Sequence, residues 1–208
     1  MKFALVSDFD GTITTRDVGD FLLLHFGLAA QKEIDESYAV GMRVEEWMKK
    51  YFRRMKYIDG IRIKKAISDH IRIRRGFREL VDFFNKNNYP LEVVSGGVDL
   101  YIDEVFGSNG IKINGFYGRF NSGDIKFDFL KKLTLSDFKA SRVKHYKKLG
   151  YKTIFCGDAT NDYRAAKEAD VVFAALKLKD ILSDENFPFY PLNNFRDVVG
   201  AINATLSH

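Results

Sequence analysis

Four short, almost uninterrupted apolar runs constrain the fold of this chain more than any other feature. They cover residues 3–7, 91–94, 151–156 and 171–174. Runs of this length without polar alternation are typical of strands that are buried on both faces of a parallel sheet. Stretches with helical character lie between them, at residues 77–85, 99–106, 141–149 and 161–169. Strands that alternate with helices predict an α/β fold, built on a doubly wound parallel sheet.

Two segments interrupt this alternation. Residues 15–75 contain only helical patterns, and we expect them to form a small helical unit inserted into a core made of residues 1–14 and 76–208. Apolar residues recur there at helical spacing, which indicates core packing rather than a cofactor site. This stripe consists of Val44, Trp47, Met48, Tyr51, Phe52, Met55 and Ile58. Residues 115–129 predict a β-hairpin that turns at residues 121–124, and residues 187–194 predict a loop before a closing helix.

The charge of the chain is unevenly distributed. The formal net charge is +5, yet residues 41–78 contain thirteen Lys and Arg against four Asp and Glu. A solvated helix face is the simplest interpretation, while binding of nucleic acid or of an anionic metabolite stays open on charge alone. No stretch approaches the ~18 apolar residues of a membrane span, and the N-terminus has no signal-peptide pattern. We therefore expect a cytoplasmic protein whose single cysteine, Cys156, is buried in an apolar run.

Polar residues follow three of the apolar runs directly. They are Asp8 and Asp10, then Ser95, Gly96 and Gly97, and finally Gly157, Asp158, Asn161 and Asp162. Ligands bind beyond the carboxyl ends of the strands in open α/β sheets, so these residues predict one site. Asp8 and Asp158 offer the hard oxygen ligands that suit Mg²⁺ together with a substrate phosphate. In such a site Asp8 can act as a nucleophile and Asp10 as an acid and base.

The ordered set of motifs resembles that of the haloacid dehalogenase-like superfamily. The motifs are Asp8-Phe9-Asp10-Gly11-Thr12, Ser95-Gly96-Gly97, a lysine at the start of a helix, and Gly157-Asp158-Ala159-Thr160-Asn161-Asp162. The inserted helices are similar to the cap of the phosphoserine phosphatase-like branch. Within that branch, the segments GFRELVDFF, VVSGGVDLYI and GDATNDYRAAKEADVVFA most resemble the phosphatases of methionine salvage. The resemblance implies a Rossmann-like core with a cap after the first strand, and a Mg²⁺-dependent phosphoric monoester hydrolase.

The resemblance also implies a role for each motif residue. Asp8 would attack the phosphorus to give an aspartyl-phosphate, while Asp10 would protonate the leaving alcohol and then activate water. The metal would be held by Asp8, Asp158 and the backbone carbonyl of Asp10, with support from Asn161 and Asp162. The substrate phosphate would be bound by Thr12, Ser95, Gly96 and a lysine. Among five candidates we select Lys139, because Lys139-Ala140-Ser141 opens the helix before the strand that ends at Asp158.

Residues that read the substrate are harder to assign. Asp17 lies where relatives often place an acidic cap residue, yet Thr14-x-x-Asp17 is equally a capping box that opens a helix. Arg72, Arg74 and Arg75 lie near the return from cap to core, where one of them could bind a second anionic group of the substrate. Ala159 replaces a glycine that is found in many relatives.

The expected function is therefore hydrolysis of a small-molecule phosphate ester, with neither a nucleic acid nor a membrane as partner. A phosphomutase or phosphotransferase of the same superfamily is an alternative, since the cap decides whether water or an alcohol takes the phosphoryl group. A catalytically idle protein that binds a partner through its basic cap is a second alternative.

Overall fold

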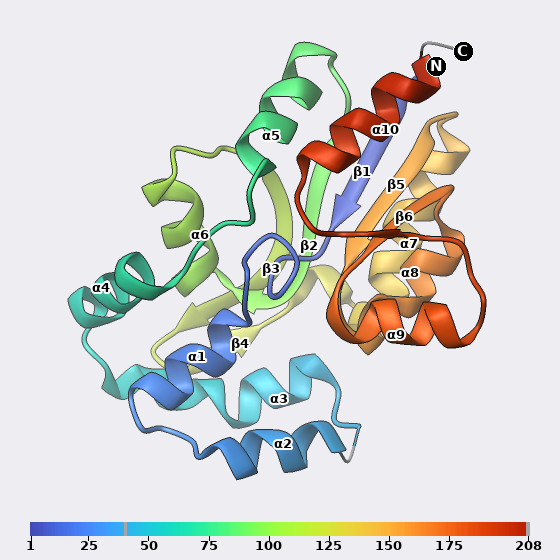
Figure 1. The fold of residues 1–208 in the computed structure, drawn as a ribbon. Coiled ribbons are helices and arrows are strands. Elements are labelled where there is room, and N and C mark those ends of the chain that lie inside the picture. Colours follow the sequence, from blue (N-terminus) through green and yellow to red (C-terminus); the bar gives the residue numbers. More distant parts are fainter. Residues whose placement is uncertain (40, 207–208) are drawn as a thin grey trace.

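The fold is built on a seven-stranded sheet in the order β4-β3-β2-β1-β5-β6-β7. The computed structural model describes residues 1–39 and 41–206 (Figure 1). The strands are β1 (Phe3–Ser7), β2 (Leu91–Val98), β3 (Asn114–Asn121), β4 (Asp124–Lys126), β5 (Lys152–Gly157), β6 (Val171–Ala174) and β7 (Tyr190–Pro191). All neighbours pair in parallel except β3 and β4. The predicted doubly wound α/β fold is confirmed, and the strand order reverses at the buried strand β1.

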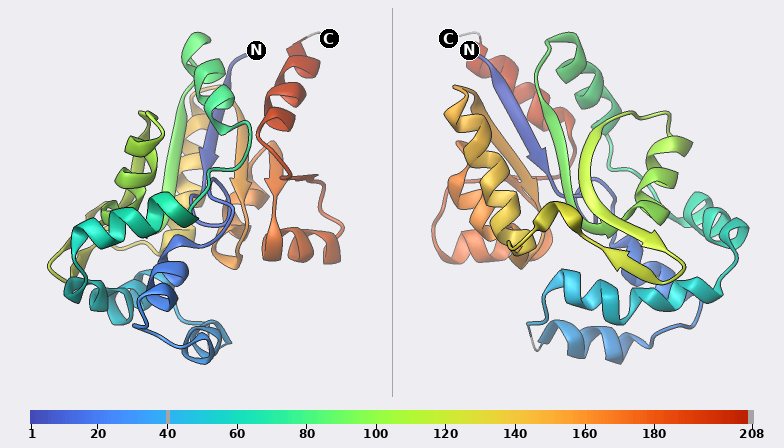
Figure 2. Two further views of the ribbon diagram at one scale, coloured as in Figure 1. Left: turned by 60° about the vertical axis from the view of Figure 1, so that its left-hand side comes forward. Right: turned by 180° about the vertical axis from the view of Figure 1, so that it is seen from behind.

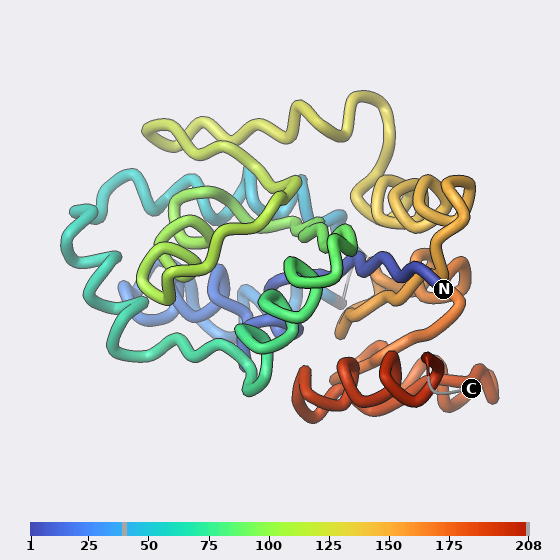
Figure 3. The backbone as a smooth tube through the Cα atoms, turned by 90° about the horizontal axis from the view of Figure 1, so that it is seen from above, coloured from blue at the N-terminus to red at the C-terminus, as the bar shows by residue number. Residues whose placement is uncertain are grey.

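Helices cover both faces of this sheet. They are α5 (Phe77–Lys86), α6 (Asp99–Ser108), α7 (Leu135–Lys148), α8 (Tyr163–Glu168), α9 (Leu176–Asp184) and α10 (Arg196–Leu206). Helices α5 and α10 lie side by side on one face, and α7 and α8 lie on the opposite face (Figures 1 and 2). Viewed from above in Figure 3, the tube passes from α7 across the sheet to α10 on the other side. Cys156 is buried in β5, as predicted.

A group of helices lies beyond the carboxyl ends of β1 and β2. It consists of α1 (Val18–His25), α2 (Gln31–Ala39), α3 (Val44–Lys50), the 3₁₀ helix η1 (Phe52–Tyr57) and α4 (Gly60–His70). The chain enters and leaves this region side by side, where Thr14 and Ile73 form an isolated antiparallel bridge. We refer to these helices as the cap, although the domain boundaries at residues 14/15 and 75/76 stay a prediction.

The apolar stripe of the cap is buried, as its spacing predicted. Trp47, Met48, Tyr51, Phe52 and Met55 all belong to the hydrophobic core of the protein. The stripe continues across a change of helix type, because α3 ends at Lys50 and the next residues form η1.

The predicted hairpin is present, and it is also part of the main sheet. Strands β3 and β4 pair antiparallel up to Asn121 and Asp124, and both turn residues have positive φ, 50° at Ser122 and 90° at Gly123. Positive φ at both central residues is what a tight two-residue hairpin turn requires. β3 also pairs in parallel with β2, which the hairpin pattern alone did not predict.

Two element boundaries differ from those expected, and two elements were not predicted. β2 continues through Ser95-Gly96-Gly97 to Val98, with a shift of register against β3 between Val94 and Val98. Helix α7 begins at Leu135 rather than at residue 141, because the Thr134 hydroxyl accepts a hydrogen bond from the Asp137 N–H and caps the helix. Helix α9 and the two-residue strand β7 were not predicted.

Candidate active site

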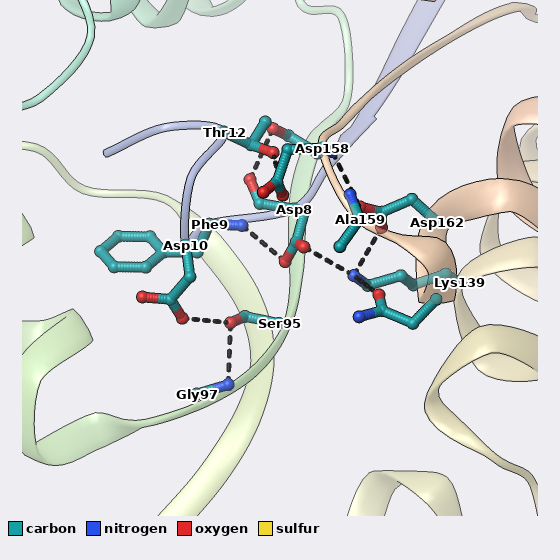
Figure 4. Close-up of polar contacts among 12 residues, drawn as sticks. Asp8, Phe9, Asp10, Thr12, Ser95, Gly97, Lys139, Asp158, Ala159 and Asp162 are labelled. Atoms are coloured by element: carbon teal, nitrogen blue, oxygen red, sulfur yellow. Dashed lines mark hydrogen bonds and ion pairs between the residues drawn. The ribbon is translucent and has the colours of Figure 1, made fainter. Parts of the chain in front are cut away.

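The three polar clusters meet at the carboxyl edge of the sheet, at the end of β1 and its two neighbours, β2 and β5 (Figure 4). Since β1 is the strand at which the order reverses, this is the place where an open α/β sheet forms its ligand crevice. A cavity of about 530 Å³ lies here between core and cap. Its lining includes six of the twelve predicted site residues, namely Asp8, Asp10, Asp17, Gly96, Asp158 and Asn161.

Asp8 lies at the centre of this cluster. Its Oδ1 accepts a hydrogen bond of 2.7 Å from the Phe9 N–H, and its Oδ2 is 2.9 Å from Lys139 Nζ. Burial raises the pKa of Asp8 to about 7, while the attraction of Lys139 opposes this rise. A further positive charge next to the Asp8 carboxyl group would favour the carboxylate form that a nucleophile needs.

Lys139 lies within α7, one turn further into the helix than expected, and its side chain is 0% exposed. Besides Asp8, its Nζ donates to Asn161 Oδ1 and to Asp162 Oδ1, each at 2.6 Å. Burial alone would lower the pKa of Lys139, but the carboxylates of Asp162 and Asp8 outweigh it and raise this pKa above its usual value. Lys139 is therefore a fixed positive charge beside Asp8.

Asp162 organises the loop after β5 rather than the cavity. Its Oδ2 accepts hydrogen bonds from the N–H groups of Asp158, at 2.9 Å, and Ala159, at 3.0 Å, while its Oδ1 faces Lys139. Both oxygens of this fully buried carboxylate are thus engaged. Ala159 contributes its backbone N–H to this network, and its φ of −122° is one that any residue can adopt, so glycine is not required here.

Asp8, Asp158 and Asp162 form a buried acidic cluster that could hold a metal ion. One oxygen from each lies within 4.8 Å of the others. Burial, followed by repulsion from Asp8, raises the pKa of Asp158 well above its ordinary value. Three carboxylates beside one lysine leave uncompensated negative charge, and their hard oxygens suit a small divalent cation. Asp8 and Asp158 line the cavity, whereas the carboxylate of Asp162 faces the loop and Lys139, so Asp8 and Asp158 are the residues that fit as ligands.

Two residues of the first motif shape this metal position. The Thr12 hydroxyl donates to Asp158 Oδ1 at 3.0 Å and is fully buried. This differs from the predicted phosphate-binding role, because the hydroxyl orients Asp158 instead. Gly11 has a φ of +68°, and a Cβ there would lie 2.2 Å from Asp158 Oδ2. Only glycine fits at this position.

Asp10 is turned away from Asp8 toward the cap. Its Oδ1 accepts a hydrogen bond of 2.9 Å from the Val18 N–H, and its Oδ2 accepts one of 2.8 Å from the Tyr101 hydroxyl. Burial, followed by repulsion from Asp17, raises the pKa of Asp10 well above its ordinary value. Burial and the neighbouring carboxylate therefore favour the protonated form of this group, which is the form that can donate a proton.

The second motif lies beside Asp10. The buried Ser95 hydroxyl accepts a hydrogen bond of 2.9 Å from the Gly97 N–H and is 3.5 Å from Asp10 Oδ2 (Figure 4). Gly96 lines the cavity, and a Cβ there would lie 2.2 Å from Val44 Cγ1 of the cap. A side chain at this position would therefore push the cap away from the core.

The candidate substrate-reading residues separate into two groups. Asp17 lines the cavity and is the N-cap of α1, accepting a hydrogen bond of 2.8 Å from the Asp20 N–H. A capping box that starts at Thr14 is wrong, since the Thr14 hydroxyl donates to the carbonyls of Phe9 and Arg16.

The two arginines of the predicted site do not line the cavity. Arg74 donates to the carbonyls of Gly11, Thr12 and Leu192, and Arg72 donates to backbone carbonyls at the end of α4. Their hydrogen bonds give both guanidinium groups a structural role in place of the substrate contact that we expected.

Several cavity residues were missed from the sequence. They are Asp20, Tyr38, Met42, Tyr101 and Lys177, together with Trp47 and Met48, which we interpreted as core only. Tyr101 follows the second motif by one helical turn, and this spacing was the one signal that could have placed it near Asp10.

A family model described as haloacid dehalogenase-like hydrolase matches residues 5–167 of this sequence. The chain belongs to the haloacid dehalogenase-like hydrolases. The family that the motifs predicted is thus confirmed, and the residues matched span all four motifs.

Relatives within this family are similar along their whole length. A 2-hydroxy-3-keto-5-methylthiopentenyl-1-phosphate phosphatase of Microcystis aeruginosa is 28% identical, with 95% of this chain and 96% of the relative covered. A polyol phosphate phosphatase of Saccharomyces cerevisiae is 24% identical, with 100% and 95% covered. A solved structure of substrate-bound phosphoserine phosphatase superposes with a TM-score of 0.74 at 21% identity, covering 97% of this chain and 98% of that one. The prediction of a haloacid dehalogenase-like hydrolase is confirmed, and its fold is similar to that of phosphoserine phosphatase.

Within residues 1–39 and 41–206, no helix has the length and apolar character needed to cross a membrane.

Proposed function

We propose that this haloacid dehalogenase-like hydrolase is a Mg²⁺-dependent phosphatase that hydrolyses small-molecule phosphate monoesters through an aspartyl-phosphate on Asp8. The observation that carries the proposal is the different setting of the two motif aspartates. Asp8 faces Lys139 and Asp158, whereas Asp10 points to the Tyr101 hydroxyl. Lys139 favours the carboxylate form of Asp8, whereas burial and repulsion from Asp17 favour the protonated form of Asp10, which supports the division of labour that this reaction needs.

The metal would be held by Asp8, Asp158 and the backbone carbonyl of Asp10. In the described part of the chain, no N–H or hydroxyl group donates to that carbonyl oxygen, so it is available as a ligand. When bound, Mg²⁺ supplies positive charge that neutralises phosphate oxygens and orients them for attack.

The residues of the chain divide the two steps between them. In the first step the Asp8 carboxylate attacks the phosphorus, the bond from phosphorus to the alcohol oxygen breaks, and the Asp10 carboxyl gives its proton to that oxygen. In the second step Asp10, now a carboxylate, accepts a proton from the water that attacks the phosphorus. Phosphate leaves, and both Asp8 and Asp10 return to their starting forms.

The phosphate itself would be bound by Lys139, the Ser95 hydroxyl and the Gly96 N–H. Lys139 also reduces the repulsion between Asp8 and the approaching phosphate. The close packing of Gly96 against Val44 of the cap supports a closed cavity in which these contacts are shielded from water.

The experiment measures phosphate release from p-nitrophenyl phosphate with Mg²⁺ and with EDTA, in the wild type and in Asp8→Asn. We expect release that requires Mg²⁺ and disappears in the variant. Mass spectrometry of Asp10→Asn after brief exposure to substrate should detect one added phosphoryl group on Asp8, because the second step lacks its base. Hydrolysis that persists in Asp8→Asn would contradict the proposal.

A further inference from the structure

The cavity above Asp8 has a second wall, which comes from the cap. Its acidic, aromatic and thioether side chains are Asp17, Asp20, Tyr38, Met42, Trp47 and Met48. We call these six residues the cap wall. Under the proposed function, the phosphate occupies the core side, so the leaving alcohol of the substrate must lie against the cap wall.

The carboxylates of the cap wall have neutral partners only. Asp17 accepts a hydrogen bond from the Asp20 N–H, and both oxygens of Asp20 accept from the Tyr38 hydroxyl, at 3.0 and 2.9 Å. Among the described residues, no lysine or arginine forms an ion pair with either carboxylate. Two acidic side chains therefore face the leaving-group end of the cavity. Burial raises the pKa of both, that of Asp20 to about 8, and a cation bound beside them would favour their charged forms.

The aromatic residues of the cap wall add a second, independent feature. The rings of Tyr38 and Trp47 are nearly parallel, with an interplanar angle of 4° and centroids 6.3 Å apart. The Trp47 indole N–H donates to the Ser37 hydroxyl at 2.8 Å, so it has no free donor for a substrate. A ring with its donor engaged contributes its apolar surface and its electron-rich face, which attract a cation.

The positive charges of the site lie elsewhere. Lys139 is neutralised by Asp8 and Asp162 on the core side. Of the described residues that line the cavity, only Lys177 is cationic, and it comes from α9 of the core. A leaving group with a carboxylate would thus meet Asp17 and Asp20 without an arginine or lysine in the cap wall, and like charges in a cavity repel.

We propose that the cap wall selects phosphate esters of amino alcohols, with the ammonium group against Asp17, Asp20 and the two aromatic rings. This inference rests on the proposed phosphatase function and names its substrate class. Carboxylates together with π faces stabilise an ammonium ion, quaternary or primary, and disfavour a second anion.

The test compares two esters of the same shape that differ only in charge: phosphocholine and its carbon analogue 3,3-dimethylbutyl phosphate. We expect kcat/KM for phosphocholine to be higher by about 10-fold, equivalent to about 1.4 kcal/mol. O-phosphoserine, which adds a carboxylate, should be hydrolysed less efficiently than phosphoethanolamine. Equal values for the matched pair, or a preference for the neutral ester, would overturn the inference.

The variant Asp20→Asn keeps the shape of the side chain and removes its charge. It should lower kcat/KM for phosphocholine about 10-fold more than for 3,3-dimethylbutyl phosphate. Glu36→Gln is the matched control, because Glu36 lies on α2 and pairs with the exposed Lys32 on the surface. A proportional loss with both esters would show a general effect on the cap and would contradict the inference.

Free choline provides a measurement that does not depend on any variant. It should inhibit hydrolysis of p-nitrophenyl phosphate competitively, whereas 3,3-dimethylbutanol should inhibit it at least about 10-fold more weakly. Absence of Mg²⁺-dependent p-nitrophenyl phosphate hydrolysis would overturn the proposed function. Normal hydrolysis without discrimination between choline and the neutral alcohol would overturn the substrate class alone.

Discussion

The core side and the cap side of the cavity differ in the partners of their charged groups. On the core side, the charge of Lys139 is paired with two carboxylates: its Nζ lies within 2.9 Å of Asp8, Asp162 and the Asn161 amide oxygen. In the cap wall, by contrast, the donors to Asp17 and Asp20 within residues 1–39 and 41–206 are neutral. This difference suggests that the paired charges of the core side hold the catalytic groups in place. The carboxylates of the cap wall, which have neutral donors, can instead pair with a charged group of the substrate.

The largest expected effect is that of Asp8→Asn. Removal of the nucleophile should lower kcat for every ester by roughly 10⁴-fold or more, irrespective of its leaving group. Steady-state phosphate release measures this loss, with Asp124→Asn in the exposed hairpin turn as a control that should keep wild-type activity. A loss of activity with some leaving groups only would mean that Asp8 selects the substrate rather than acting as the nucleophile. The core side and the cap side of the cavity would then not differ in function.

Lys139→Met tests how much the buried ion pairs of Lys139 with Asp8 and Asp162 contribute to stability and activity. The variant leaves the buried carboxylates of Asp8 and Asp162 without their cation, so the free energy of unfolding should fall by about 3–5 kcal/mol, and kcat by roughly 10³-fold. Urea denaturation and steady-state kinetics measure the two effects.

Lys144→Met is the control on the same helix. Lys144 pairs with Glu168 at 3.1 Å on the surface, where the two side chains are 54% and 38% exposed, so its loss should cost at most about 0.5 kcal/mol. Similar losses in both variants would show that burial of the network contributes nothing beyond a surface pair.

Gly11→Ala tests the metal position without removing a ligand. A Cβ at Gly11 would collide with Asp158 Oδ2, so the variant should need a higher Mg²⁺ concentration for half-maximal activity, by about 10–100-fold. Gly27→Ala is the matched control, because Gly27 has a similar φ of +64° with nothing within 4 Å of a Cβ. It should lose about 1 kcal/mol of stability through backbone strain and keep its Mg²⁺ dependence. Equal Mg²⁺ dependence in both would contradict the assignment of Asp158.

The dependence of stability on pH should differ between the metal-free protein and the protein with Mg²⁺ bound. In the metal-free protein the pKa of Asp8 is raised from 3.8 to about 7, so the folded state binds more protons than the unfolded state between these values. The free energy of unfolding should therefore decrease as pH rises through this window. Mg²⁺ competes with protons for carboxylates, so it should stabilise the protein more above pH ~7 than below pH ~5. Above pH ~7, and at 100 times its Kd, Mg²⁺ should raise the free energy of unfolding by about 2.7 kcal/mol. Thermal melting with and without Mg²⁺ measures this, and an equal gain at both pH values would contradict the assigned site.

The contrast between the two sides also explains what the sequence could predict. Asp8, Asp10 and Asp158 follow apolar runs directly, and parallel strands bring their carboxyl ends to one edge, so local pattern and topology suffice. Asp20 and Asp35 look alike in sequence, yet Asp20 lines the cavity and Asp35 bonds to Gln31 on the surface. Which of them points inward depends on how each cap helix is rotated against the core, and no local signal encodes that rotation.

Side chains that act on the backbone were a second source of error. Arg74 was one of three candidates, with Arg72 and Arg75, for binding a second anionic group of the substrate. Its guanidinium instead binds the carbonyls of Gly11, Thr12 and Leu192, which come from two distant segments of the chain. Backbone acceptors carry no sequence signature, so such a role becomes visible only in the fold. The strand β7 was missed for a related reason, since two residues ending in Pro191 are too short for a period.

The smallest effect is expected from the outer face of the cap, which carries its positive charge. Lys49, Arg53 and Lys56 are exposed there, on the side of α3 and η1 that does not form the cap wall. If the acidic cap wall alone reads the leaving group, changing all three to Gln should alter kcat/KM for phosphocholine by less than about 3-fold at physiological ionic strength, where charges beyond ~8 Å are screened. The same kinetics at low and high salt measure any long-range steering, which should be shallow. A steep salt dependence that disappears in the triple variant would instead indicate that the basic face binds a polyanion. Both faces of the cap would then contribute to substrate selection.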